Sequence, residues 1–175
     1  IFIVSAGNLD PLDARPAWPA QVKDAVQMLA EIGESNQGIT APGEHILGLT
    51  IGAVNPEGAV GYTALLPTTY TRRGPGVGGA RKPDLAQRGG VEGSPSGLVS
   101  LTSLGNPIDS HGTSYATPLV AATMATLDQR LAGKAPRETL IALPVHRAKR
   151  SPILEEKPLR HISREFVGFG IPPPA

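Results

Sequence analysis

The sequence predicts an α/β fold in which helices cover a mostly parallel sheet. Two short apolar runs of strand character, at residues 1–5 and 46–54, alternate with helical patterns at 21–32 and 113–131. Such continuous apolar runs are typical of parallel strands that are buried on both faces. The chain also holds 21 glycines and 18 prolines among its 175 residues, which argues against a helical bundle and indicates many turns.

The first elements follow from local pattern. Residues 1–5 form a β-branched run that predicts a buried strand and leads into Ala6-Gly7-Asn8. A proline-rich loop is expected at 10–19. Residues 21–32 have apolar side chains at helical spacing, and Gly33 is expected to end this helix. Turns are expected at 35–44.

The middle of the chain predicts short strands separated by loops. Residues 46–54 predict a second buried strand, and 62–70 are expected to be extended. The segment 71–97 is rich in glycine, proline and arginine and predicts a loop with one short strand near Leu85. Residues 98–101 predict another short strand.

The C-terminal part contains the clearest helix, at residues 113–131. Its segment 115–127 is apolar on nearly all sides, so we expect the helix to be buried. A shorter helix is expected at 137–143, a polar loop at 148–165, and a tail that ends in prolines at 168–175.

Composition excludes several classes of function. Sixteen basic residues against 15 acidic ones give a net charge of +1, so nucleic acid is not an expected partner. The absence of cysteine excludes disulfides, thiolate metal sites and a cysteine nucleophile. No run approaches the roughly 20 apolar residues that span a bilayer, so no membrane partner is expected. The glycine-rich segment 74–79 lacks the Lys-Ser/Thr of a phosphate loop, so nucleotide binding is not expected either.

Ser114 is the first candidate for chemistry, because it lies at the start of the long predicted helix. Backbone N–H groups at a helix N-terminus favour a developing negative charge. Small neighbours, Gly112 and Ala116, leave room for a substrate backbone, and proline at position 118 is tolerated in a first helical turn. Taken alone, the pattern equally fits a serine that only caps the helix.

Asn8 is the second candidate, since its side-chain amide follows a strand and could donate to an oxyanion. Together, Ser5-Ala6-Gly7-Asn8 and the segment 112–118 resemble the oxyanion-hole and nucleophile motifs of the subtilisin-like serine peptidases, the subtilases. Further similar segments lie between and after these motifs. They are Pro42-Gly43 with the strand at 49–54, Thr71-Arg72-Arg73-Gly74-Pro75 with Lys82-Pro83-Asp84, and Phe166-Val167-Gly168-Phe169-Gly170.

The resemblance implies a three-layer subtilisin-like α/β fold and a serine endopeptidase that works through an acyl-enzyme. Ser114 would be the nucleophile, and the Asn8 amide would hold the oxyanion. Residues Ser5, Ala6 and Gly7 would form one wall of the substrate pocket, and Thr113 would support the cleft. Thr40 takes the place of a frequent glycine at the pocket floor, which implies a shallow pocket.

The sequence also departs from the family pattern. The catalytic Asp and His of subtilases precede the oxyanion Asn, whereas this chain opens on Ile1 just before Asn8. We therefore expect residues 1–175 to be the C-terminal part of a catalytic domain, inactive alone, and to associate with the missing half or with itself. His111 is not expected to replace the base, because it lies only three residues before Ser114 across a turn.

The expected partner is a peptide or protein substrate, with no cofactor and no metal ligands that can be placed, although subtilases often hold structural calcium. Asparagine is scarce and arginine plentiful, unlike in the Asn- and Ser-rich secreted subtilases. The stretches at 49–53 and 112–120 resemble bacterial subtilases that work inside cells, so a bacterial cytoplasmic location is favoured over a secreted one. Two alternatives stay open: a non-catalytic binding or regulatory module on a subtilase-like frame, and an unrelated α/β binding domain.

Overall fold

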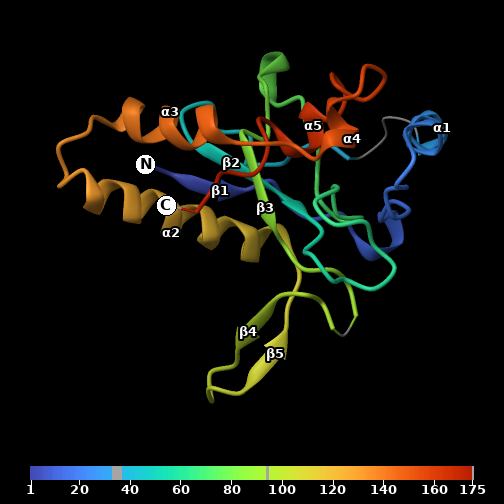
Figure 1. The fold of residues 1–175 in the computed structure, drawn as a ribbon, viewed down its shortest axis with the longest axis horizontal. Helices are drawn as coiled ribbons and strands as arrows, with labels where there is room; N and C mark the ends of the chain where they lie inside the picture. Colours follow the sequence, from blue (N-terminus) through green and yellow to red (C-terminus); the bar gives the residue numbers. More distant parts are fainter. Residues whose placement is uncertain (33–36, 94, 175) are drawn as a thin grey trace.

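A parallel three-stranded sheet forms the centre of the computed structural model, which describes residues 1–32, 37–93 and 95–174 (Figure 1). The strands are β1 (Ile3–Ser5), β2 (Leu49–Val54) and β3 (Leu85–Arg88), in the order β1-β2-β3. All six residues of the central strand β2 are buried. The predicted parallel sheet is therefore confirmed.

Helices cover both faces of this sheet. On one face, Leu49, Ile51 and Ala53 of β2 pack in a core with α2 (Thr113–Arg130) and α3 (Arg137–Arg147). On the other face, Val54 packs in a core with α1 (Val22–Ile32), α4 (Pro152–Glu155) and α5 (Arg164–Val167). This alternation along β2 follows from the two-residue period of a strand. The predicted three-layer α/β arrangement is confirmed.

The two predicted strands are shorter and less buried at their starts than expected. Ile1 and Phe2 precede β1 and are 48% and 75% exposed, and the side chains of β1 itself are only half-buried. Ile46 and Leu47 are each 67% exposed and precede β2. The side chains of β1 are only half-buried because β1 is an edge strand, which pairs with β2 alone among the described residues.

The expectation that helix 113–131 is buried on nearly all sides is wrong for α2. One face is buried, with Thr113, Ala116, Val120 and Met124 at helical spacing. The opposite face carries Tyr115 and Leu119, which are 41% and 39% exposed. Because the sheet contacts only one side of the helix, the apolar residues of the other side face outward. Pro118 lies in the second turn rather than the first. Because proline has no N–H, the carbonyl oxygen of Ser114, four residues earlier, receives no helical hydrogen bond from it.

An antiparallel hairpin, which the sequence only half predicts, precedes α2. The expected strand at 98–101 is β4 (Val99–Leu101), and it pairs with β5 (Pro107–Asp109) instead of joining the central sheet. The hairpin projects away from the body of the molecule (Figure 1). The segment 62–70, expected to be extended, forms turns, with a single bridge from Pro67 to Val54. Hydrogen bonds between Asn55 and residues 63–66 hold these turns.

The predicted polar loop at 148–165 is more ordered than expected. It holds α4 and the start of α5, and Leu154 and Leu159 in this otherwise polar segment are fully buried. Helix α3 continues to Arg147, one turn beyond its predicted end. The start of the predicted tail pairs along the edge of β3, where Ala86 N–H donates to Gly170 O at 3.0 Å.

Two short 3-10 helices complete the fold, η1 (Pro11–Asp13) and η2 (Val77–Gly79). Helix α1 confirms the predicted helix at 21–32 to within one residue. Its expected end at Gly33 and the expected turn residue Ser35 lie outside the described residues.

The ion pair between Glu57 and Arg88 gives a pH-dependent contribution to stability. Arg88 Nε donates to Glu57 Oε2 at 2.6 Å, and this bond lowers the pKa of Glu57 to about 2. A folded-state pKa below the unfolded value of 4.5 means stabilisation that is complete above about pH 4.5 and is lost towards pH 2. Because the pair is largely exposed and screened, Glu57→Gln should lower the free energy of unfolding by less than about 1 kcal/mol at pH 7.

Urea denaturation at pH 7 and pH 3 measures this difference. The loss caused by Glu57→Gln should shrink at the lower pH. The matched variant Glu92→Gln, at an exposed glutamate with no ion pair among the described residues, should change neither value. A loss that is equal at both pH values would contradict this assignment.

Candidate active site at the start of helix α2

Two hydrogen bonds hold the start of α2 against the loop after β1. The backbone N–H and the hydroxyl of Thr113 both donate to Asn8 Oδ1, at 3.0 and 2.9 Å. Because a backbone N–H can only donate, the carbonyl oxygen of the Asn8 amide must face Thr113. The Nδ2 group of Asn8 is thereby turned to the other side. Its N–H donors make no hydrogen bond within the part of the chain that the structure describes.

Ser114 is exposed in the first turn of α2, directly after the buried Thr113. Its backbone N–H is one of the first donors of the helix, which have no acceptor within the helix. No hydrogen bond of its hydroxyl is found among the described residues. Gly112 leaves space beside the Asn8 amide, since a Cβ at this position would lie 3.1 Å from Asn8 Nδ2. Its φ of +137° is also a backbone conformation that favours glycine. The site thus presents the Ser114 hydroxyl together with the N–H groups of Asn8 Nδ2 and of the Ser114 backbone, which have no acceptor among the described residues.

The hydroxyl of Tyr70 fixes the backbone that leads into α2. It accepts from Gly112 N–H at 3.0 Å and lies 2.7 Å from Gly89 O and 2.9 Å from Gly90 O, to which it can donate. Burial raises the pKa of Tyr70 far above its usual value of 10, so the hydroxyl keeps the proton that it donates. Sequence reasoning missed Tyr70, because no local pattern marks a tyrosine 42 residues before its partner.

The residues predicted to form a pocket wall, Ser5, Ala6 and Gly7, connect the end of β1 to Asn8. Ser5 ends β1, and the fully buried Ala6 donates its N–H to Ile51 O at 2.9 Å. Gly7 has φ +93°, a left-handed conformation that favours glycine. A Cβ at Gly7 would lie 3.0 Å from Arg72 Cδ and 3.5 Å from Thr40 Oγ1, so Gly7 lies beside both residues.

Arg72 makes hydrogen bonds to the backbone of this segment. Its N–H donates to Gly7 O at 3.0 Å, and its guanidinium donates to Asn8 O at 3.1 Å and to Gly38 O at 2.9 Å. The buried Arg15 donates to Thr71 O, the carbonyl of the residue directly before Arg72. Burial, with Arg73 close by, lowers the pKa of Arg15 to about 9, so it is still a cation at neutral pH. Arg72 therefore acts directly on the backbone that carries Asn8, whereas Arg15 acts on Thr71, which is bridged to Asn8.

His111 lies beside Tyr70, with a distance of 5.6 Å between the ring centroids. No hydrogen bond joins it to Ser114 in the described part of the chain, and its role stays as predicted from the sequence. Among the described residues, no group of three or more His, Asp and Glu side chains could hold a metal ion. Likewise, no helix there is long and apolar enough to cross a membrane.

The sequence matches the model of a known protein family. The model of the subtilase family, Peptidase S8, matches residues 1–170. No curated protein matches the sequence at a significant level.

Solved structures with the same fold include three proteases. The prenylagaramide maturation protease PagA is 19% identical with a TM-score of 0.58, and the match covers 97% of this chain and 57% of PagA. MycP1 from Mycobacterium smegmatis is 20% identical with a TM-score of 0.56, over 99% of this chain and 40% of MycP1. The patellamide maturation protease PatG is 17% identical with a TM-score of 0.55, over 87% and 46%. This chain thus spans about half the length of these proteases.

The bonds of Tyr70 predict a measurable loss of stability. Tyr70→Phe removes the buried hydroxyl between Gly112 and the two glycine carbonyls, and should lower the free energy of unfolding by about 1–2 kcal/mol. Urea denaturation followed by circular dichroism measures the change. Tyr115→Phe, at a tyrosine that is 41% exposed on α2, is the matched control and should change stability by less than about 0.5 kcal/mol. Equal effects of the two variants would show that the Tyr70 hydroxyl does not stabilise the site.

Proposed function

Since this chain belongs to the subtilase family, we propose that the protein it comes from is a serine endopeptidase with Ser114 as its nucleophile. The observation that carries the proposal is the orientation of Asn8. Its carbonyl oxygen is occupied by Thr113, so its amide N–H groups are presented at the start of α2 beside the serine. A serine that served only as a helix cap would require no such oriented donor.

The proposed reaction is acyl transfer. Ser114 Oγ attacks the carbonyl carbon of the scissile peptide bond, and its proton passes to a general base. The negative charge on the carbonyl oxygen is stabilised by Asn8 Nδ2 and by the Ser114 backbone N–H. Collapse of this intermediate releases the amine product and leaves an ester on Ser114, which water then hydrolyses. Loss of one such side-chain donor costs roughly 10²–10³ in kcat in subtilisin itself.

The proposed substrate is an extended polypeptide that lies along Ser5, Ala6 and Gly7. The loop around Gly7 faces Thr40, so we propose a shallow pocket for the side chain before the scissile bond. Such a pocket favours small side chains at that position, because a bulky one would meet the threonine.

We further propose that the general base and its orienting Asp lie in another segment of the same protein. Within the described residues, no histidine is hydrogen-bonded to Ser114. Tyr115 and Leu119 on α2 and Phe2 before β1 are exposed apolar side chains around the edge strand. We propose that the complementary segment packs against these exposed residues, and that self-association of the chain is the alternative way to cover them.

A non-catalytic binding or regulatory module is the second candidate function. The observation that favours it is the same lack of a base at Ser114 among the described residues. In that case the oriented Asn8 and the exposed Ser114 would bind a polypeptide without cleaving it.

Fluorophosphonate labelling, read by intact mass, separates the two. The 175-residue chain alone should remain unlabelled, whereas the chain co-expressed with the upstream segment of its protein should be labelled once, at Ser114. Ser114→Ala should abolish the labelling, and Ser110→Ala, at the buried serine nearest to it in sequence, should not. Labelling of the isolated chain would place the base within it, and no labelling after co-expression would favour the non-catalytic module.

A further inference from the structure

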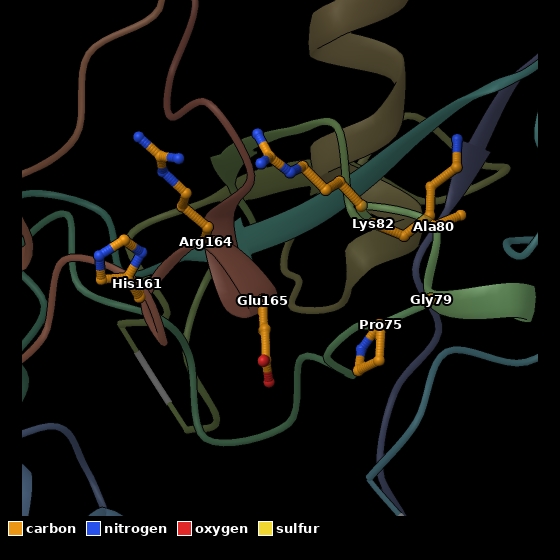
Figure 2. Close-up of a pocket in the computed structure, with 8 residues that line it drawn as sticks. Pro75, Gly79, Ala80, Lys82, His161, Arg164 and Glu165 are labelled. Atoms are coloured by element: carbon orange, nitrogen blue, oxygen red, sulfur yellow. The ribbon is translucent and has the colours of Figure 1, made fainter.

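A cationic cavity lies between the glycine-rich loop and α5, built from elements that the proposed reaction does not use. It has a volume of about 210 Å³ and is lined by Pro75, Gly79, Ala80, Arg81, Lys82, His161, Arg164 and Glu165. Figure 2 shows His161 and Arg164 on one side and Pro75 and Gly79 on the other. Arg81 and Arg164 also line a smaller hollow next to it, together with Pro83 and Phe169.

The charges that line this cavity do not cancel. Lys82 is neutralised, because its ammonium lies 2.6 Å from Asp84 Oδ2 and also donates to Gly48 O at 2.7 Å. Glu165, the one carboxylate of the lining, pairs with Arg73 at 3.6 Å. It extends from α5 in the opposite direction to Arg164 (Figure 2).

Arg81 and Arg164 therefore supply uncompensated positive charge. Neither guanidinium makes an ion pair or a hydrogen bond with another of the described residues. His161 adds an imidazole to the same lining. Guanidinium groups bind phosphate and carboxylate oxygens in a bidentate way, which makes a pair of unpaired arginines a suitable cradle for one oxyanion.

We propose that this cavity is a binding site for a phosphate-class oxyanion, held by Arg81 and Arg164 with His161 at its side. The anion would join the loop at 74–82 to α5. Gly74, at the start of this loop, already donates its N–H to Glu165 O at 2.7 Å, and Arg72 just before it holds the backbone of Asn8. Binding should therefore stabilise the part of the fold that carries Asn8 as well as the loop itself.

An NMR titration of the full 175-residue chain with inorganic phosphate at constant ionic strength tests this proposal. The amide signals of Gly79, Ala80 and His161 should shift and saturate together. Arg81→Gln and Arg164→Gln should each weaken phosphate binding by about tenfold, because each removes a charge-assisted bond. Arg81 is exposed, so its variant should keep the amide spectrum of the unbound chain, and Arg81→Lys should restore part of the affinity.

The matched control is Arg147→Gln, because Arg147 lines another basic hollow, with Arg88, Lys149 and Arg150. This variant should leave phosphate affinity unchanged. Sodium acetate at equal ionic strength distinguishes a phosphate site from a general carboxylate site, and should bind at least tenfold more weakly. Shifts that never saturate, an equal loss in Arg147→Gln, or no loss in Arg81→Gln and Arg164→Gln would overturn the proposal.

Discussion

The site depends on the contact between Asn8 and Thr113, two residues 105 positions apart in the chain. Through this contact the loop after β1 and the first turn of α2 become one unit. The contact also sets the orientation of the Asn8 amide. The donors on Thr113 bond its carbonyl oxygen, which leaves its N–H groups for another acceptor. If Asn8 were turned over, its N–H group would face the backbone N–H of Thr113, and two donors would meet without an acceptor.

The parallel sheet explains how these two distant segments meet. Parallel strands end at the same edge of their sheet, so the residues after β1 and after β3 lie at one edge, with β2 between the two strands. Asn8 follows β1, and Gly89 and Gly90 follow β3, where their carbonyls lie within hydrogen-bonding distance of the Tyr70 hydroxyl. Gly112 is bonded both to Tyr70 and to Gly89. The start of α2 is thus fixed from two strands at once.

The sequence could predict what local pattern determines and little of what depends on contacts between distant residues. The apolar run of β2 and the spacing of α1 marked these elements well, and the motifs around Asn8 and Ser114 pointed to residues that the structure brings together at one site. Tyr70 was not singled out, and Arg72 was named only as part of a similar segment, because the hydrogen-bond partners of both lie far away in sequence. The burial of α2 was overestimated, since an apolar composition does not say whether a second surface covers the helix.

A double-mutant cycle on Asn8→Ala and Thr113→Val tests most directly whether these two side chains act as one unit. Thr113→Val removes the hydroxyl donor but keeps the shape of this fully buried residue. The free energies of unfolding of the wild type, the two single variants and the double variant are measured by urea denaturation. A coupling energy of about 0.5–1.5 kcal/mol is predicted for the hydroxyl bond. Additive effects of the two substitutions would contradict a direct bond between Asn8 and Thr113.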